Sequence, residues 1–246
     1  KAGEKLGMKQ LIDIVDGLPQ GKSLDLNQAA GVEKFDSRIM GTNTFSNIKD
    51  SDIVVITAGV ARKPGMSRED LLKINTDIVK KSAEAIKVHS PDSIVISVTN
   101  PLDIMTYLVY KTTGFKKNKV IGMAGILDSA RFAYFISEEL NVSIKDISPM
   151  VLGSHGDTMV AIPRYTTVSG VPLTDLIPKE KIDRLDQRAR DGGAEIVSFL
   201  KTSSAYFAPG SSVVEMLESI IKDQKRILPC SALLQGEYGL DDVFIG

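Results

Sequence analysis

The feature that most constrains the fold is a run of four consecutive β-branched residues, Ile53-Val54-Val55-Ile56, within the segment 52–58. A strand that is apolar on both faces is typical of a parallel sheet covered by helices on both sides. From residue 70 to about residue 88 the apolar side chains recur with helical spacing, and a second strand signal follows at 93–99. This succession of strand, helix and strand predicts an α/β fold with a doubly wound parallel sheet.

The remaining sequence divides into two regions with different patterns. In the first half we predict strands at 11–15, 38–42 and 120–122, and a helix that begins at Pro101 and ends at Gly114. In the second half we predict strands at 150–153, 159–169, 226–234 and 243–245, and helices at 179–202 and 211–223. Glycines punctuate residues 122–125, so we expect an α/β domain over 1–122 and an α+β domain over 123–246.

The composition excludes several classes of protein. Of the 246 residues, 43% are hydrophobic and 25% are charged, which is ordinary for a globular protein. A net charge of −1 argues against nucleic acid or an anionic membrane as the main partner. No apolar run reaches the ~18 residues that a membrane span needs. The lone Cys230 excludes an intrachain disulfide and is typical of a reducing compartment, which predicts a cytoplasmic protein.

An acid–base site is indicated around His155, one of only two histidines. It lies in the run Gly-Ser-His-Gly-Asp at 153–157, directly after an apolar strand, where glycines let a ligand approach closely. Upstream, Asp128 and Arg131 are three residues apart at the start of a predicted helix, and therefore on one face. An imidazole, an orienting carboxylate and an anion-binding guanidinium suit proton transfer. Arg131 can equally be a surface residue in an ion pair, and His89 is read as a helix-dipole contact.

Three strand ends indicate a bound cofactor, because ligands of open α/β sheets lie beyond the carboxyl ends of the strands. Asp13 can accept hydrogen bonds from both ribose hydroxyls of an adenine dinucleotide. The small residues of Thr57-Ala58-Gly59 let a cofactor approach the backbone, and the Asn100 amide, after Thr99, can face a substrate or a nicotinamide. The alternatives are that Asp13 only forms a surface turn, and that residues 57–59 and 99–101 only form loops. A single ligand explains all three.

The loop at 60–70 carries three cations, Arg62, Lys63 and Arg68, between proline and glycine residues. An irregular loop with two arginines can close over an anionic substrate, because arginine binds carboxylates in a bidentate manner. The alternative is a solvated basic loop.

Three motifs in combination resemble the lactate/malate dehydrogenase family, and within it the malate-oxidising branch. They are Val-Thr-Asn-Pro-Leu-Asp at 98–103, Gly-Met-Ala-Gly-Ile-Leu-Asp-Ser-Ala-Arg at 122–131 and Gly-Ser-His-Gly-Asp at 153–157. The resemblance runs along the whole chain. It implies a Rossmann-type dinucleotide-binding domain over 1–122, a catalytic domain over 123–246, NAD as cofactor, a small dicarboxylic acid as substrate, and a homo-oligomer, either dimer or tetramer.

The resemblance also implies roles for individual residues. His155 resembles the proton donor and acceptor, and Asp128 its orienting carboxylate. Arg131 resembles the arginine that grips the substrate carboxylate beside the reacting carbon, and Arg68 the loop arginine that polarises the carbonyl. Arg62 resembles the specificity residue, whose place typically holds glutamine in lactate enzymes; a guanidinium there would meet the second carboxylate of a four-carbon diacid.

The implied cofactor contacts lie along the first domain, and Asn100 is implied to touch both substrate and nicotinamide. The full set is Asp13, Thr57, Ala58, Gly59, Asn75, Val98, Thr99 and Asn100. No metal is expected. The alternatives are a lactate or other 2-hydroxyacid dehydrogenase, and a catalytically silent binding protein.

One departure from the family concerns the N-terminus. The family begins with a strand, a Gly-x-Gly-x-x-Gly turn and a helix, whereas residues 1–6 resemble only the tail of that helix. We therefore expect a segment of a longer polypeptide that lacks about 20–25 residues at the front, and also its C-terminal end. Because the missing strand is central in the order 3-2-1-4-5-6, strands 11–15 and 52–58 should have unpaired inner edges, and these residues alone should bind NAD weakly.

Overall fold

The computed structural model describes residues 8–60, 68–156 and 158–246, without the side chain of residue 68. The predicted helix tail at 1–6 and the residue Arg62 lie outside this description. In the first half the elements are β1 (Met8–Ile12), α1 (Leu18–Glu33), β2 (Arg38–Thr42), the 3₁₀ turn η1 (Phe45–Ile48), β3 (Ile53–Ile56), α2 (Arg68–His89), β4 (Ile94–Ser97), α3 (Leu102–Thr113), η2 (Lys117–Lys119) and β5 (Val120–Gly122).

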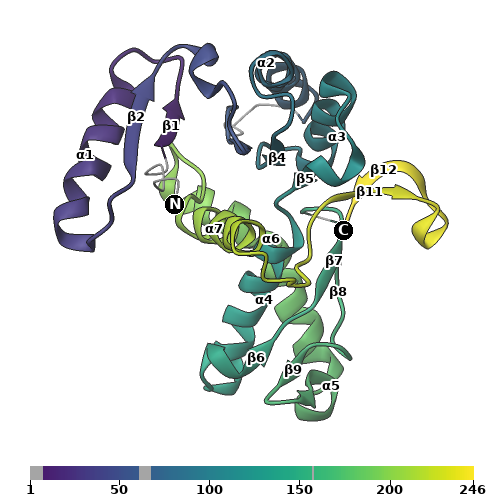
Figure 1. Cartoon of the computed structure of the whole chain (residues 1–246). Helices are drawn as coiled ribbons and strands as arrows, with labels where there is room; N and C mark the ends of the chain where they lie inside the picture. The colour runs from purple at the N-terminus through teal and green to yellow at the C-terminus, as the bar shows by residue number, and fades with distance from the viewer. Residues whose placement is uncertain (1–7, 61–67, 157) are drawn as a thin grey trace.

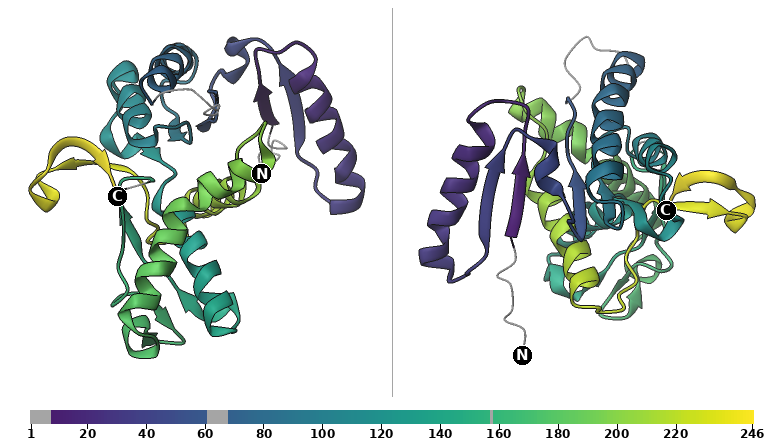
Figure 2. Two further views of the ribbon diagram at one scale, coloured as in Figure 1. Left: turned by 180° about the vertical axis from the view of Figure 1, so that it is seen from behind. Right: turned by 45° about the horizontal axis from the view of Figure 1, so that its top comes forward.

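The first half is a parallel sheet in two parts (Figure 1). Strands β3, β4 and β5 pair in that order, with Ile53 opposite Ile94 and Val95 opposite Val120. Strand β1 pairs in parallel with β2, and α1 packs along this second part. Among the described residues no ladder joins β1 to β3, so both strands have an unpaired edge, as the sequence predicts. The right-hand view of Figure 2 shows the two parts side by side, with α1 next to β1–β2 and α2 over the part formed by β3–β5.

The second half is an α+β unit below this sheet. Its elements are α4 (Gly125–Leu140), η3 (Ile144–Asp146), β6 (Ile147–Ser148), β7 (Val151–Gly153), β8 (Met159–Ala161), β9 (Thr167–Val168), β10 (Val171–Pro172), α5 (Leu173–Leu176), α6 (Lys179–Leu200), α7 (Phe207–Ile221), β11 (Ala232–Gln235), η4 (Glu237–Gly239) and β12 (Asp241–Ile245). Strands β6 to β10 form antiparallel pairs, and α4 packs against α6.

The hairpin β11–β12 returns from the second half to the first, where it packs against α3 (Figure 1). The Phe244 ring lies 5.6 Å from the Tyr110 ring and 6.4 Å from the Tyr107 ring, centroid to centroid. Lys111 Nζ lies 3.0 Å from Asp242 Oδ1 at the rim of this contact. Side chains from the two halves, which are far apart in the sequence, are therefore in contact.

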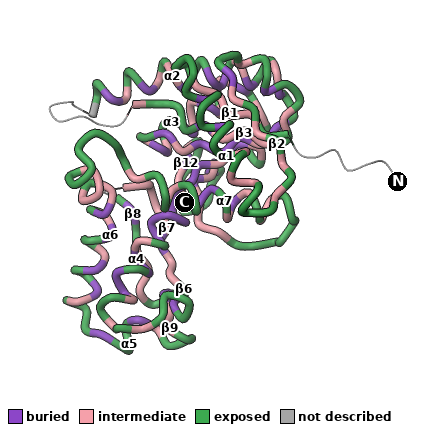
Figure 3. Tube along the Cα trace, turned by 90° about the vertical axis from the view of Figure 1, so that its left-hand side faces the viewer, coloured by how far each residue is buried: buried purple, intermediate pink, exposed green. Residues whose placement is uncertain are grey.

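The core forms three clusters, seen as buried stretches in Figure 3. One lies under β3–β5 and includes Val79, Val95 and Phe244. A second fills the lower half around α4 and β7, and a third, with Ile96 and Leu127, joins β4 to the start of α4. This third cluster fixes the start of α4, which carries Asp128, against the sheet.

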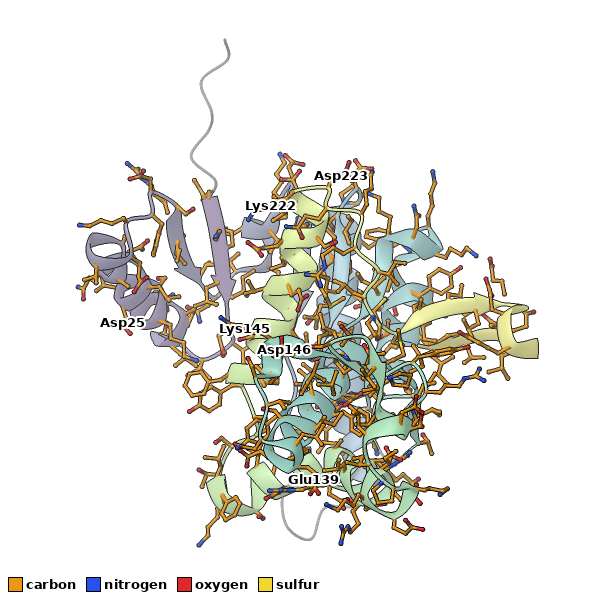
Figure 4. The ribbon with its side chains drawn as sticks, turned by 90° about the horizontal axis from the view of Figure 1, so that it is seen from below. Asp25, Glu139, Lys145, Asp146, Lys222 and Asp223 are labelled. Carbon is orange, nitrogen blue, oxygen red and sulfur yellow. The ribbon has the colours of Figure 1, made fainter. Side chains whose placement is uncertain are left out.

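Charged pairs lie on the outside of the molecule. Glu139 of α4 pairs with Lys181 of α6, and Lys222 pairs with Glu218 at the end of α7, with Nζ and Oε1 2.7 Å apart (Figure 4). Exposed pairs of this kind contribute little to stability, because water and salt screen them. Separately, within the described ranges no helix combines the length and the apolar character needed to cross a membrane.

Most predicted elements are present, and the α/β class is confirmed. Helix α1 was not predicted, because its apolar residues do not gather on one face and it holds two internal glycines. The bounds predicted for the first strand, 11–15, are wrong, because β1 runs from Met8 to Ile12. The chain turns at Asp13, whose side chain accepts a hydrogen bond from the Val15 N–H at 2.9 Å.

Three predictions for the second half need correction. The strand predicted at 159–169 is broken after Ala161, because the backbone turns through Pro163 and the N–H groups of residues 165 and 166 donate to the Ile162 carbonyl. The strand predicted at 226–234 begins only at Ala232. Helix α7 begins at Phe207, four residues before the predicted start.

Candidate functional site

His155 lies in the tight connection between β7 and β8. Gly153, with φ of 85°, and Gly156, with φ of 107°, adopt the left-handed conformation that glycine tolerates without a steric penalty. The Gly246 N–H, just after β12, donates to the Gly153 carbonyl at 3.1 Å, so the end of the second half supports this turn. The turn thus presents a mostly buried imidazole, with its backbone held at Gly153.

His155, Asp128 and Arg131 meet in space, as the sequence predicts. His155 Nδ1 lies 2.9 Å from Asp128 Oδ2, and Arg131 Nη1 lies 3.5 Å from Asp128 Oδ1. The Asp128 side chain is only 2% exposed, against 11% for His155 and 15% for Arg131. A carboxylate only accepts hydrogen bonds, so it holds the proton of the neutral imidazole on Nδ1 and leaves Nε2 for a ligand.

Arg131 occupies a space that two glycines of α6 leave for it. A Cβ added at Gly192 would lie 3.3 Å from Arg131 Cδ, and one added at Gly193 would lie 3.4 Å from Nη2. Burial lowers the pKa of Arg131, and the Asp128 carboxylate acts in the opposite direction. Arg131 Nε is buried and has no hydrogen-bond partner among the described residues. A buried donor without an acceptor is costly, so the placement of this guanidinium lowers stability.

The sequence analysis did not identify Gly192 and Gly193, and it did not identify Asp103 and Ser231, which support the backbone of His155. The Asp103 carboxylate accepts from the His155 backbone N–H at 3.1 Å and from the Ser231 hydroxyl at 2.6 Å. A double glycine inside a predicted helix is the one sequence signal available, because glycine destabilises a helix interior by about 1 kcal/mol relative to alanine. Asp103 and Ser231 are 128 positions apart in the sequence, so no local sequence pattern indicates their contact.

The predicted cofactor residues lie at the carboxyl ends of three strands. Asp13 follows β1, residues 57–59 follow β3 with their side chains or Cα exposed, and residues 98–100 follow β4. A Cβ at Gly59 would lie 2.6 Å from Thr99 Cγ2, so only glycine fits there. The Thr99 hydroxyl donates to the Ala58 carbonyl at 2.8 Å, which ties the second and third of these ends together.

Asn75 is buried and holds two of these loops. Its Oδ1 accepts from the Val60 N–H at 2.8 Å, and its Nδ2 donates to the Asn100 carbonyl at 2.7 Å. The next peptide bond, between Asn100 and Pro101, is cis. In the described structure the amide of Asn75 therefore shapes the loops beyond β3 and β4.

These strand ends fit a dinucleotide. Residues 57–59 are exposed, Asp13 offers a half-exposed carboxylate, and the side chain of Asn100 is exposed as well. A carboxylate beyond a strand of an open α/β sheet suits ribose hydroxyls. Arg68 begins α2, but its side chain lies outside the description. The described residues hold no group of three His, Cys, Asp or Glu side chains suited to a metal ion.

Comparison with known proteins identifies the family. Residues 2–122 match the family model for the NAD-binding domain of lactate/malate dehydrogenases, and residues 126–246 match the model for their alpha/beta C-terminal domain. The chain belongs to the lactate/malate dehydrogenase family. The resemblance inferred from the three motifs is therefore confirmed.

Individual relatives agree with this assignment. A malate dehydrogenase of Methanosarcina barkeri (strain Fusaro / DSM 804) is 57% identical over 242 residues, which cover 98% of this chain and 79% of the relative. The crystal structure of Cryptosporidium parvum malate dehydrogenase matches with a TM-score of 0.94 and 42% identity, over 98% of this chain and 78% of that one. A lactate dehydrogenase of Cryptosporidium parvum, solved with lactic acid and the dinucleotide cofactor, matches with a TM-score of 0.92 and 40% identity, over 96% and 76%.

Replacing His155 by Asn is expected to lower turnover of oxaloacetate by about 10²–10⁴-fold, because the positioned acid–base group is lost. NADH affinity, measured by fluorescence titration, should change little. His89→Asn is the matched control, because the second histidine ends α2 and is placed in no site. Near-normal turnover of the His155 variant in steady-state assays would contradict the assignment.

Replacing Gly192 by Val should displace Arg131. If Arg131 holds the substrate as predicted, kcat/KM for oxaloacetate should fall by about tenfold or more, because small misplacements of such a group are costly. Gly31→Val in α1 is the control, since no heavy atom lies within 4 Å of its added Cβ. Thermal melting of both variants separates misfolding from a local effect. Equal kcat/KM values for both variants would show that the space beside Arg131 has no part in catalysis.

Proposed function

We propose that this protein is an NAD-dependent malate dehydrogenase, which interconverts (S)-malate and oxaloacetate. The observation that carries the proposal is the buried group of His155, Asp128 and Arg131 at the junction of the two halves. It joins an acid–base residue to a carboxylate-binding residue beside strand ends that suit a dinucleotide. The 57% identity to a curated malate dehydrogenase supports the same activity.

Proton transfer is the task of His155. When bound, NAD accepts or supplies the hydride. His155 Nε2 takes the hydroxyl proton of malate in one direction, and in the other it returns a proton to the carbonyl oxygen of oxaloacetate. Asp128 fixes the tautomer through Nδ1 and stabilises the imidazolium that forms.

Substrate orientation falls to arginines. Arg131, whose side chain is 15% exposed, would hold the carboxylate next to the reacting carbon. Arg62 would bind the second carboxylate, and Arg68 would stabilise the charge that develops on the carbonyl oxygen. Fixing both ends of the substrate supplies the entropic part of the catalysis.

The dinucleotide would lie across the strand ends. We assign the ribose contact to Asp13, backbone contacts to residues 57–59, and contacts near the nicotinamide to residues 98–100. Asn75 would act on the cofactor chiefly through these loops, because its amide already bonds Val60 and Asn100. This assignment goes with a dinucleotide-binding domain over 1–122 and a catalytic domain over 123–246.

Lactate dehydrogenase is the second candidate, because the fold alone does not separate the two activities: a lactate enzyme matches with a TM-score of 0.92. Arg62 is the residue that favours malate, since pyruvate has no second carboxylate to pair with it.

The substrate choice is tested by replacing Arg62 with Gln. The parent protein should use oxaloacetate far better than pyruvate, and the variant should lose about 2–5 kcal/mol of that preference, because one charge of a buried pair is left unpaired. The measurement is the ratio of kcat/KM for the two keto acids, followed through NADH consumption. No turnover of either acid by the parent would instead favour a silent binding protein, and an unchanged ratio would make Arg62 a mere loop cation.

We also propose that the protein works in the cytoplasm as a homo-oligomer. The lone cysteine suits a reducing compartment. Large apolar side chains stay exposed on α6 and α7, where Phe199 is 76%, Phe207 79% and Ile221 71% exposed. These exposed side chains would suit contact with a second copy of the chain, where they would be covered. Light scattering after gel filtration should give the mass of a dimer or tetramer, and Phe207→Ser should shift it toward the monomer; a monomeric parent would refute the proposal.

A further inference from the structure

Asp103 lies at the junction of three segments that form the site. It is in the first turn of α3, three residues after Asn100. Its Oδ2 accepts from the His155 N–H at 3.1 Å, and its Oδ1 accepts from the Ser231 hydroxyl at 2.6 Å. One carboxylate therefore links the loop after β4, the turn after β7 and the segment before β11.

Ser231, the second partner of Asp103, is itself held in place. Ser231 is fully buried, and its backbone exchanges two hydrogen bonds of 2.8 Å with Gly122 at the end of β5. Asp103 thus anchors the His155 backbone to the sheet, while Asp128 holds the His155 ring to α4. The ring and the backbone of one residue are positioned by two different carboxylates.

A purely local role does not explain this carboxylate. An acidic residue in the first turn of a helix is favoured by the helix dipole. However, both oxygens of Asp103 bond to segments outside α3. Burial raises the pKa of Asp103, and the hydrogen bonds from Ser231 and His155 oppose that shift. A partly buried carboxylate still loses hydration, so an apolar residue would serve better if packing were its only task.

We propose that Asp103 is a positioning residue for the reaction, which sets the place of His155 relative to the Asn100 loop. This inference rests on the proposed dehydrogenase function. Asp103 reaches the substrate only through His155, so its loss should lower kcat more than it changes the KM for oxaloacetate or the affinity for NADH. A misplacement of the acid–base group by about 1 Å can cost up to about 100-fold in rate.

The test compares three variants in the purified protein. Asp103→Ala removes both hydrogen bonds and should lower kcat by about 10- to 100-fold. Asp103→Asn keeps one acceptor oxygen for the His155 N–H and an NH₂ group that can donate to Ser231 Oγ, so it should restore most of kcat. Ser231→Ala keeps the hydrogen bond between Asp103 and His155 but removes the donor to Asp103 Oδ1. Its kcat should lie between those of the parent and Asp103→Ala.

Stability is controlled with Thr113→Val. Thr113 is buried at the other end of α3, and its hydroxyl donates to the Val109 carbonyl at 2.8 Å. This variant should lower the melting temperature without lowering kcat. If kcat follows melting temperature across all four variants, Asp103 is only structural and the proposal is overturned.

Two further results would also overturn it. If Asp103→Asn is as slow as Asp103→Ala, the negative charge matters and not the position that the hydrogen bonds set. If Asp103→Ala keeps the parent kcat, the residue does not position His155 at all. Failure of the proposed function is a different outcome, because then the parent itself would not turn over oxaloacetate.

Discussion

The buried carboxylate of Asp128 is the constraint on which the site depends. At 2% exposure it would be strongly destabilising alone, and it is tolerated because an imidazole faces one oxygen and a guanidinium faces the other. This requirement fixes the turn after β7 and the first turns of α4 relative to each other. It also explains the two glycines of α6, which make room for Arg131 at the expense of helix propensity.

The rest of the fold supplies the rigidity that this group needs. Leu127, next to Asp128, lies in the cluster that joins α4 to β4, so the carboxylate is tied to the sheet. The hairpin β11–β12 and the segment before it return to the first half, where Ser231 pairs with Gly122 and Phe244 packs on α3. Residues from both halves of the chain are therefore held together where the strand ends converge.

Sequence patterns predicted what depends on neighbouring residues. The β-branched run at 53–56 and the amphipathic pattern of α2 are local, and both elements were found within two or three residues. Helix α1 was missed because its apolar residues have no helical periodicity. The trio of His155, Asp128 and Arg131 was predicted from motifs, whereas the Asp103–Ser231 bond spans 128 positions, a separation that no local pattern encodes.

The charges of the described site show that a dicarboxylate would need further cations to bind there. Asp128 and Asp103 bring two carboxylates against the single guanidinium of Arg131, so the region is electronegative until His155 is protonated. A dicarboxylate would add two further negative charges to this buried place, which Coulomb repulsion disfavours unless cations accompany it. In the sequence, the segment between β3 and α2 carries three cations, Arg62, Lys63 and Arg68. A diacid substrate therefore requires cations beyond Arg131, and the roles proposed for Arg62 and Arg68 would supply two of them, which links substrate choice to this segment of the sequence.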